Sequence, residues 1–426
     1  MTEIRKLIPL RYLRCLRLSL WTAVALTGAM LVPPLYGREL RKPKVRAITA
    51  FVRIDRENYV EQLDRAVRLL RQAKAAFEKS GYEVETLRVT TQPFPDYVRG
   101  LTRQQALDFF ASLNALSEKQ SFSVSIGRAN PGGAHGEIAT DLLAEILATT
   151  NLNASVSVAG EDGIYWHAVG AAAKIMKYLE TSSQNGVRNF DFAAAAMVPP
   201  YSPFFPTSYH NGDGHQFSVG LEAGNFVADV FQQAGGDFRR AEELLSQVLS
   251  TQARDLEVVG EQIQKDSGWT YMGLDATPAP NLDSSIAAGI ESLIGGKFGS
   301  NGTLSAVRII TEAVQSIPVK RAGYSGLMLP VLEDPLLAQR WSEGTYNLDS
   351  LLAYSAVCGT GLDAVPLPGD VPEKQLERII GDVASLALKW HKPLTARLIL
   401  APGKKPGERT EFDSPHLTNT ALRALP

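Results

Sequence analysis

The sequence predicts an α/β fold, built either as a barrel or as a large doubly wound sheet. Short segments in which apolar and polar residues alternate are followed by amphipathic segments of ten or more residues, and the pair recurs along the chain. This alternation is typical of βα units that form a parallel sheet. Eight or more strands are expected from it. In both arrangements ligands bind at the carboxyl ends of the strands.

The alternation begins with a strand at 45–54 and an amphipathic helix at 57–79, which Gly81 ends. The first half continues with strands at 82–86, 122–126 and 154–158 and helices at 102–116, 137–147 and 165–179. The second half has strands at 216–221, 271–276 and 395–401 and helices at 241–263, 284–293, 304–317, 336–341, 348–357 and 376–390. The glycine- and proline-rich turn at 402–407 predicts a closing hairpin.

Composition and charge exclude some classes of protein. The chain has 426 residues, of which 45% are hydrophobic and 21% charged, an ordinary globular composition. Its net charge of −2 argues against a nucleic-acid partner, because proteins that bind nucleic acids carry a basic excess. Cys15 and Cys358 are too few for a disulfide framework, and we expect both to be reduced. The sequence names no cofactor and no oligomeric state.

The N-terminus has the layout of a signal or signal anchor. Basic residues precede an apolar run at 18–32, which is shorter than a full membrane span. We therefore divide the chain into a basic and apolar extension with a linker at 1–42 and a single domain at 43–426. Attachment to a membrane through 18–32 would place the domain outside the cytoplasm. The alternative is a buried extension or a start codon assigned too early, in a cytoplasmic protein.

A glycine-rich corner at 209–215 contains titratable side chains. His210 is a candidate acid or base, with Asp213 orienting its imidazole, and the same pair suits a divalent metal. The alternative is a polar turn whose side chains bond to the backbone.

A second glycine-rich loop precedes the helix at 304–317. Backbone amides at a helix start, with a lysine nearby, suit an anionic group. The alternative is a loop in which a threonine caps the helix. Asp283, after a proline-rich turn, is a candidate N-cap or a carboxylate that faces a pocket. The candidate ligand-binding residues are Asp283, Lys297, Gly299, Asn301, Gly302 and Thr303.

The corner at 354–363 carries a thiol and a carboxylate. Cys358 is a candidate nucleophile, and Asp363 is near enough in sequence to direct a proton. The alternative is a small buried cysteine at a helix end, with Gly359 as the left-handed cap.

These corners together resemble the uncharacterised PFL-like family, domain of unknown function 711. The resemblance covers nearly all of the chain after the N-terminal extension, and the extension departs from it. It rests on the segments 123–127, 210–212, 278–280, 283–284, 299–303, 323–327 and 358–363.

The resemblance implies a fold similar to that of pyruvate formate-lyase and other glycyl radical enzymes. That fold is a ten-stranded α/β barrel with helices outside and a loop inside. In the glycyl radical enzymes an active cysteine lies on the inner loop, and Cys358 would correspond to it only by analogy. Glycyl radical enzymes also carry Arg-x-x-Gly-Tyr/Phe near the C-terminus, and nothing after Cys358 matches this motif.

We therefore predict an enzyme that acts on a small polar or anionic metabolite in the barrel, without glycyl radical chemistry. His210 and Asp213 would act as acid or base and orienting group. Cys358 and Asp363 would contribute from the inner loop, so that the imidazole and the thiol share one cavity. One alternative is a non-catalytic metabolite-binding or regulatory protein on the same barrel, and another is a metal-dependent hydrolase.

Overall fold

The computed structural model describes residues 40–131 and 133–425. The strands are β1 (Lys44–Val52), β2 (Val84–Thr90), β3 (Ser123–Arg128), β4 (Asn153–Gly160), β5 (Gly163–Ile164), β6 (Phe192–Ala196), β7 (Gly214–Glu222), β8 (Thr270–Ala279), β9 (Gly361–Pro368) and β10 (Leu394–Ala401). All ten belong to one sheet, in the order β8-β7-β1-β2-β3-β4-β6-β10-β9, with β5 paired to β4. The protein is therefore an α/β protein, as predicted.

The sheet consists of two groups of parallel strands. In the first group β1, β2, β3, β4 and β6 are parallel neighbours. In the second group β7 is parallel to β8, and β9 is parallel to β10. The groups meet where β1 pairs antiparallel with β7 and where β6 pairs antiparallel with β10.

A non-strand segment, 320–331, lies between the two edge strands. On one side Ala322 donates its N–H to the carbonyl of Leu274 on β8, at 3.1 Å. On the other side Val331 donates to the carbonyl of Asp363 on β9, at 3.0 Å. Both contacts are parallel bridges made with segments outside the named strands. The sheet itself is open, because its edge strands β8 and β9 do not pair with each other. Segment 320–331 bridges these two strands and completes the barrel that the resemblance implies.

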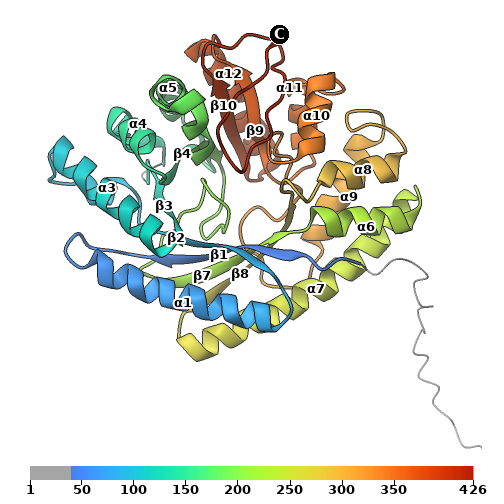
Figure 1. The fold of residues 1–426 in the computed structure, drawn as a ribbon, viewed down its shortest axis with the longest axis horizontal. Helices are drawn as coiled ribbons and strands as arrows, with labels where there is room; N and C mark the ends of the chain where they lie inside the picture. The colour runs from blue at the N-terminus through green and yellow to red at the C-terminus, as the bar shows by residue number, and fades with distance from the viewer. Residues whose placement is uncertain (1–39, 132, 426) are drawn as a thin grey trace, which may run out of the picture. The chain divides into compact units, whose positions relative to one another are not determined.

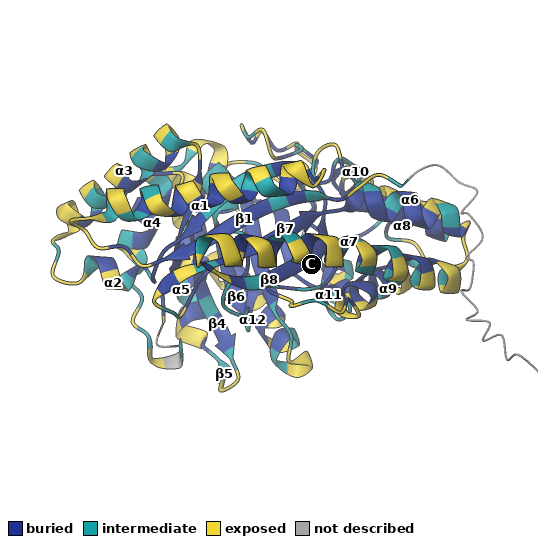
Figure 2. Ribbon diagram, turned by 90° about the horizontal axis from the view of Figure 1, so that it is seen from below, coloured by how far each residue is buried: buried dark blue, intermediate teal, exposed yellow. Residues whose placement is uncertain are grey.

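The helices are α1 (Tyr59–Lys79), α2 (Pro95–Val98), α3 (Arg103–Gln120), α4 (Thr140–Thr149), α5 (Trp166–Ser182), α6 (Gly224–Ala234), α7 (Phe238–Ser267), α8 (Ile286–Ile294), α9 (Thr303–Gln315), α10 (Pro335–Glu343), α11 (Leu348–Ser355) and α12 (Glu373–Trp390), with 3₁₀ turns η1 (Gly133–His135) and η2 (Gln184–Asp191). Figure 1 shows the helices around the outside of the sheet. Figure 2 shows buried and exposed residues alternating along α1, because one face of this amphipathic helix packs on the strands.

A loop at 197–213, between β6 and β7, lies inside the ring of strands and helices (Figure 1). The hydroxyl of Thr49 on β1 donates to the carbonyl of Pro203 at 2.9 Å. The hydroxyls of Thr90 on β2 and Ser208 lie 2.6 Å apart. The expectation that the inner loop carries Cys358 and Asp363 is therefore wrong: 197–213 is the loop that the barrel wall holds inside.

Most helices and strands form where the sequence predicts them, within a few residues, but the short elements β5 and α2 and the longer β6, α6 and β9 were missed. All residues of β6 and β9 are buried, so neither strand shows the alternation that marks a half-buried strand. The predicted hairpin at 402–407 is wrong as well, because β10 pairs with β6 and β9 and not with the chain that follows the turn. In the described residues after β10, the one β-bridge joins Arg409 to Ala421.

The predicted signal or anchor segment at 18–32 lies outside the described residues. Among the described helices, none is long and apolar enough to cross a bilayer.

Candidate functional site

A cavity of about 730 Å³ lies inside the barrel. Its wall includes residues of β1, β2, β3, β4, β8, β9 and β10, of the inner loop and η2, and of the segments 320–331 and 413–416. Its size is within the range of cavities that hold small metabolites. The charged and hydroxyl-bearing residues that line it include Arg46, Glu85, Arg88, Arg188, Asp191, Thr207, Tyr324, Glu333, Thr360, Asp363, Thr395, Arg397 and His416.

Buried ion pairs connect opposite parts of this wall. Arg46 on β1 contacts Glu85 at 3.0 Å, Glu222 at 3.3 Å and Glu333 at 3.3 Å. The same Glu333 carboxylate accepts a hydrogen bond from Arg397 on β10. Buried ion pairs of this kind are costly to break on one side only, because the remaining charge keeps its burial but loses its partner. The chain of charges therefore fixes the geometry of the wall.

Arg88 on β2 has a different environment from the other arginines that line the cavity. Its Nε donates to the hydroxyl of Thr86 at 3.1 Å, and an Nη donates to the carbonyl of Pro203 at 3.4 Å. Its guanidinium lies 5.0 Å from the ring centre of Phe205. Among the described residues it has no ion pair with a carboxylate. Burial, and then repulsion by Arg46, lowers the pKa of Arg88 to about 9, so the group is still charged at neutral pH.

Two carboxyl groups near the arginines hold protons more tightly than usual. Burial, together with a hydrogen bond to Glu85, raises the pKa of Glu222 to about 8. Burial also raises the pKa of Asp363, although its carboxylate accepts a hydrogen bond from Nε of Arg397 at 2.6 Å. Glu222 contacts Arg46 but is not part of the lining, whereas Asp363 is. The wall therefore contains a carboxyl group that keeps its proton to a higher pH than an ordinary aspartate, a property that suits a general acid.

Hydroxyl groups occupy another part of the wall. The phenol of Tyr324 lies 2.6 Å from the hydroxyl of Thr207 and 2.5 Å from that of Thr395. The buried hydroxyl of Thr360 has no hydrogen-bond partner among the described residues. An unsatisfied buried hydroxyl costs free energy unless a ligand or water supplies the missing bond.

His416, in the irregular segment after β10, also lines the cavity, although much of the residue is exposed. Its ring stacks on Phe190 of η2, with ring centres 6.3 Å apart and planes inclined by 17°. Partial desolvation of the imidazole lowers its pKa, so the neutral form, which can accept a proton, prevails at neutral pH.

The structure places His210 away from the cavity lining, in a buried position beside β1. One ring nitrogen lies 3.0 Å from the carbonyl oxygen of Val52 and the other 3.1 Å from that of Gly212. Burial lowers the pKa of His210. Both nitrogens lie against backbone carbonyl oxygens, one of which accepts the N–H of the neutral ring. This is the arrangement of a polar turn, and Asp213 in the same turn is exposed.

Cys358 is fully buried between α11 and β9 and does not line the cavity. Its sulfur accepts a hydrogen bond from the N–H of Gly361 at 3.4 Å. Lys392, which is distant in sequence, donates to the Cys358 carbonyl rather than to its sulfur. The prediction that Gly359 is a left-handed cap is wrong, because α11 ends at Ser355 with Ala356 as its C-cap. The structure thus does not bring the imidazole of His210 and this thiol into the cavity, whereas Asp363 lies in its wall.

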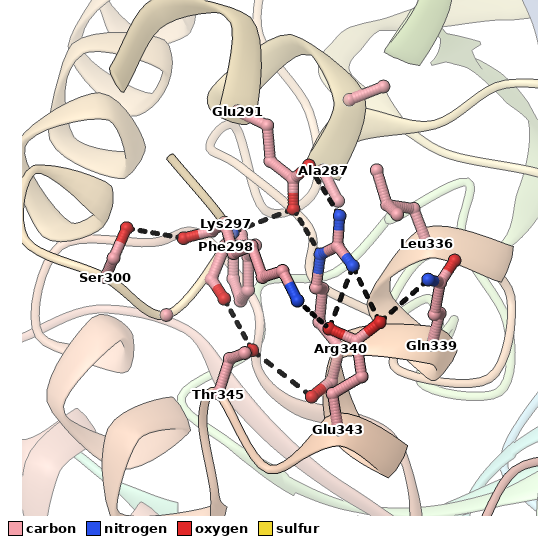
Figure 3. A network of polar contacts seen from close by, with 12 residues as sticks. Ala287, Glu291, Lys297, Phe298, Ser300, Leu336, Gln339, Arg340, Glu343 and Thr345 are labelled. Atoms are coloured by element: carbon pink, nitrogen blue, oxygen red, sulfur yellow. Dashed lines mark hydrogen bonds and ion pairs between the residues drawn. The ribbon is translucent and has the colours of Figure 1, made fainter. Parts of the chain in front are cut away.

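The loop before α9 is held by polar contacts with residues of α8 and α10 (Figure 3). Lys297 is exposed and pairs with Glu343 at 2.9 Å, and Glu343 also pairs with Arg340 at 2.8 Å. The hydroxyl of Thr303 accepts a hydrogen bond from the N–H of Gly299 at 3.1 Å. This loop therefore has internal partners, and it does not line the cavity.

The remaining candidate ligand-binding residues are Asn301, Gly302 and Asp283. Asn301 is exposed, and Gly302 has a φ of 97° at the N-cap of α9. Asp283 does not cap α8, because Ser285 accepts the hydrogen bond from Ala288 at the start of that helix. The Asp283 carboxylate lies 3.6 Å from Nζ of Lys44, and Asp283 is not part of the cavity lining.

The sequence analysis missed the arginines of the wall. Arg46, Arg88 and Arg397 each lie inside a strand between apolar residues. In a sheet with one solvated face such residues point to water, whereas in a barrel they point into the interior. The sequence signal that could have identified these arginines is a charged residue between apolar residues in several strands. No group of three His, Cys, Asp or Glu side chains in the described residues is arranged to hold a metal ion.

Comparisons with known proteins agree with the resemblance found in the sequence. The family model described as "Uncharacterised ACR (DUF711)" matches residues 39–414. A UPF0210 protein of Pyrobaculum arsenaticum is 30% identical over 400 residues, which cover 86% of this chain and 87% of the relative. A UPF0210 protein of Methanosarcina mazei is 28% identical and covers 73% of this chain and 69% of the relative.

Among solved structures, the anaerobic ribonucleotide reductase of Thermotoga maritima in complex with dATP and CTP aligns with a TM-score of 0.42 and 9% identity. The alignment covers 88% of this chain and 79% of the reductase. The family match covers most of the chain and both relatives share its name. This protein is a member of the uncharacterised DUF711 (UPF0210) family.

Proposed function

We propose that the protein is an enzyme that binds a small organic anion in the barrel cavity and transfers protons to or from it, without glycyl radical chemistry. The observation that carries the proposal is Arg88, a guanidinium in the cavity wall that lacks a carboxylate partner. A buried cation without a counter-ion is costly, and a bound anion removes that cost. The ligand would take the place that Glu333 takes for Arg46 and Arg397.

The proposed acid–base chemistry is assigned to groups that touch the cavity. Asp363 lies against Arg397 and has a raised pKa, so it would donate a proton to the bound anion. His416, with its lowered pKa, would accept one. His210 and Cys358 lie outside the lining, so the mechanism assigns them no contact with the ligand.

A non-catalytic metabolite-binding protein is the second candidate, because His210 and Cys358, the reactive side chains singled out in the sequence, are both buried outside the cavity lining. It shares the anion site at Arg88 and differs only in the absence of turnover. Product analysis after incubation with a bound ligand separates the two candidates.

Thermal unfolding with added acetate, benzoate, succinate or inorganic phosphate tests the proposed anion site. A ligand that binds only the folded state raises the melting temperature in proportion to occupancy. We expect at least one of these anions to stabilise the wild-type protein and to lose the effect in Arg88→Met. Arg308→Met is the control, since Arg308 is an arginine outside the cavity that pairs with Glu242 and Glu312. Equal anion effects in the wild type and in Arg88→Met would contradict the proposal.

A further inference from the structure

We propose that the ligand of the cavity is a monocarboxylate with a flat apolar body, held by its carboxylate at Arg88 and by its body against Phe205. This inference rests on the proposed function and specifies its substrate class. Three observations each support one part of the proposal: the distribution of charged groups in the wall, the orientation of Arg88 and the aromatic rings beside it.

The distribution of charge in the wall favours a single negative charge on the ligand. Of the arginines that line the cavity in the described residues, Arg46, Arg188 and Arg397 each have a carboxylate within 4.0 Å. Arg88 has none in contact, so its guanidinium is the one among these four that a carboxylate of the ligand could pair with directly. A second negative charge on the ligand would meet the carboxylates of Glu85 and Glu333, both of which act electrostatically on Arg88. Like charges at close range in a protein interior repel strongly.

Arg88 is held in place before any ligand arrives. Thr86 and Pro203 accept hydrogen bonds from two of its nitrogens. The bond to Pro203 ties the guanidinium to the inner loop, which Thr49 also holds through the same carbonyl. The remaining N–H groups have no partner in the described part of the chain. A planar guanidinium with free N–H groups suits a carboxylate, and its fixed orientation lowers the entropy cost of binding.

Aromatic and apolar side chains lie next to the cations. Arg88 lies 5.0 Å from the ring centre of Phe205, and Arg397 lies 4.6 Å from that of Phe190. Phe204 and Met328 contribute further apolar surface to the lining. A small anion such as acetate would leave most of the cavity of about 730 Å³ unfilled. A flat apolar body attached to the carboxylate would bury its surface against these rings.

Isothermal titration calorimetry with matched probes tests the inference. Benzoate carries one charge and a flat body, benzamide removes the charge, acetate removes the body, and phenyl phosphate and inorganic phosphate carry additional negative charge. We expect benzoate to bind with a Kd of about 1 mM or tighter, which is the range for a ligand of its size. We expect each of the other probes to bind at least about tenfold more weakly.

Variants test whether benzoate binding depends on Arg88 and Phe205. Arg88→Met should weaken benzoate binding at least about tenfold, whereas Arg308→Met should leave it unchanged. Phe205→Leu should weaken benzoate binding and leave acetate binding unchanged. Phe205 is only half-buried, so this substitution is compatible with folding. Melting curves of each variant verify that it is folded.

The outcomes separate the inference from the proposed function. If either phosphate probe binds more tightly than benzoate and depends on Arg88, the substrate class is wrong while the anion site stands. If acetate binds as tightly as benzoate, the inference that the ligand has an apolar body is wrong. If no anion depends on Arg88, or benzamide binds as tightly as benzoate, both the inference and the proposed function are wrong. Absence of saturable benzoate binding near about 10 mM overturns the inference.

Discussion

Asp363 on β9 accepts a hydrogen bond from Nε of Arg397 on β10, at 2.6 Å, inside the barrel. The pair joins two neighbouring parallel strands across the cavity wall, and Glu333 continues the contact from Arg397 to Arg46. An interior with this many ionised groups is expensive to desolvate. We interpret this desolvation cost as a consequence of maintaining a binding site inside the barrel.

Arg88→Met should make the ligand-free protein more stable. The substitution replaces an unpaired cation in the cavity wall by an apolar side chain of similar length, which removes the desolvation cost of a charge without a partner. Because Arg88 is only partly buried, we expect a gain of about 1 kcal/mol. Urea unfolding at pH 7 measures the difference. A variant less stable than the wild type by more than about 1 kcal/mol would show that Arg88 supports the fold.

The stability gained in Arg88→Met should depend on pH. The pKa of Arg88 is about 9 in the folded protein and 12.5 without burial. Because the folded pKa is depressed, the penalty of the charged form is fully present below about pH 9 and decreases as pH rises above it. The difference between Arg88→Met and the wild type should therefore be constant from pH 6 to 8 and smaller at pH 10. A difference that stays the same at pH 10 would contradict the lowered pKa.

The raised pKa of Glu222 predicts a second pH dependence of stability, over a different pH range. Its pKa is raised from 4.5 to about 8 in the folded state. The folded protein therefore binds a proton that the unfolded chain releases above pH 4.5, so this group's stabilisation is complete below that pH and is lost as pH rises towards about 8. Glu222→Gln should remove this dependence and be more stable relative to the wild type at pH 8 than at pH 5. Parallel pH profiles of the two proteins would refute the assignment.

Asp363→Asn should reduce both stability and turnover. The change leaves Arg397 with Glu333 alone, and removal of one partner of a buried ion pair typically costs about 3–5 kcal/mol. Chemical unfolding measures the first effect. Once a substrate is identified, kcat measures the second. A variant that keeps the wild-type kcat would exclude Asp363 as the proton donor.

Cys358 should be unreactive in the folded protein. It is fully buried, its sulfur accepts a hydrogen bond, and Lys392 bonds to its carbonyl oxygen instead of activating the sulfur. In a Cys15→Ser background, a colorimetric disulfide reagent should report no reactive thiol at neutral pH and one thiol in denaturant. Reaction of the native protein within minutes would make a nucleophilic role for Cys358 credible again.

The fold could be predicted from the sequence because most strands and helices have clear periods. The alternation at 82–86 and the stripe of α1 both come from elements with one buried face. Strands β6 and β9 are buried on both sides, so they have no such period. The resemblance supplied what periodicity could not, namely that the strands form a barrel.

The site was predicted less well, for a physical reason. His210 and Cys358 attract notice because imidazole and thiol groups are reactive, but burial and hydrogen bonds to the backbone depend on the folded chain. Arg46, Arg88 and Arg397 resemble solvent-facing residues of ordinary strands, and only the closure of the sheet turns them inward. Asp363 was singled out for its closeness to Cys358 and instead lies with Arg397.

A bromide soak followed by anomalous diffraction from a crystal tests the central claim most directly. Bromide is a monatomic anion, so it reports where the protein accepts negative charge without any assumption about the rest of the ligand. The account predicts a bromide ion in the barrel cavity in contact with the free N–H groups of Arg88, and none there in Arg88→Met. Bromide sites confined to the outer surface, with an ordered cavity that holds no anion, would contradict it.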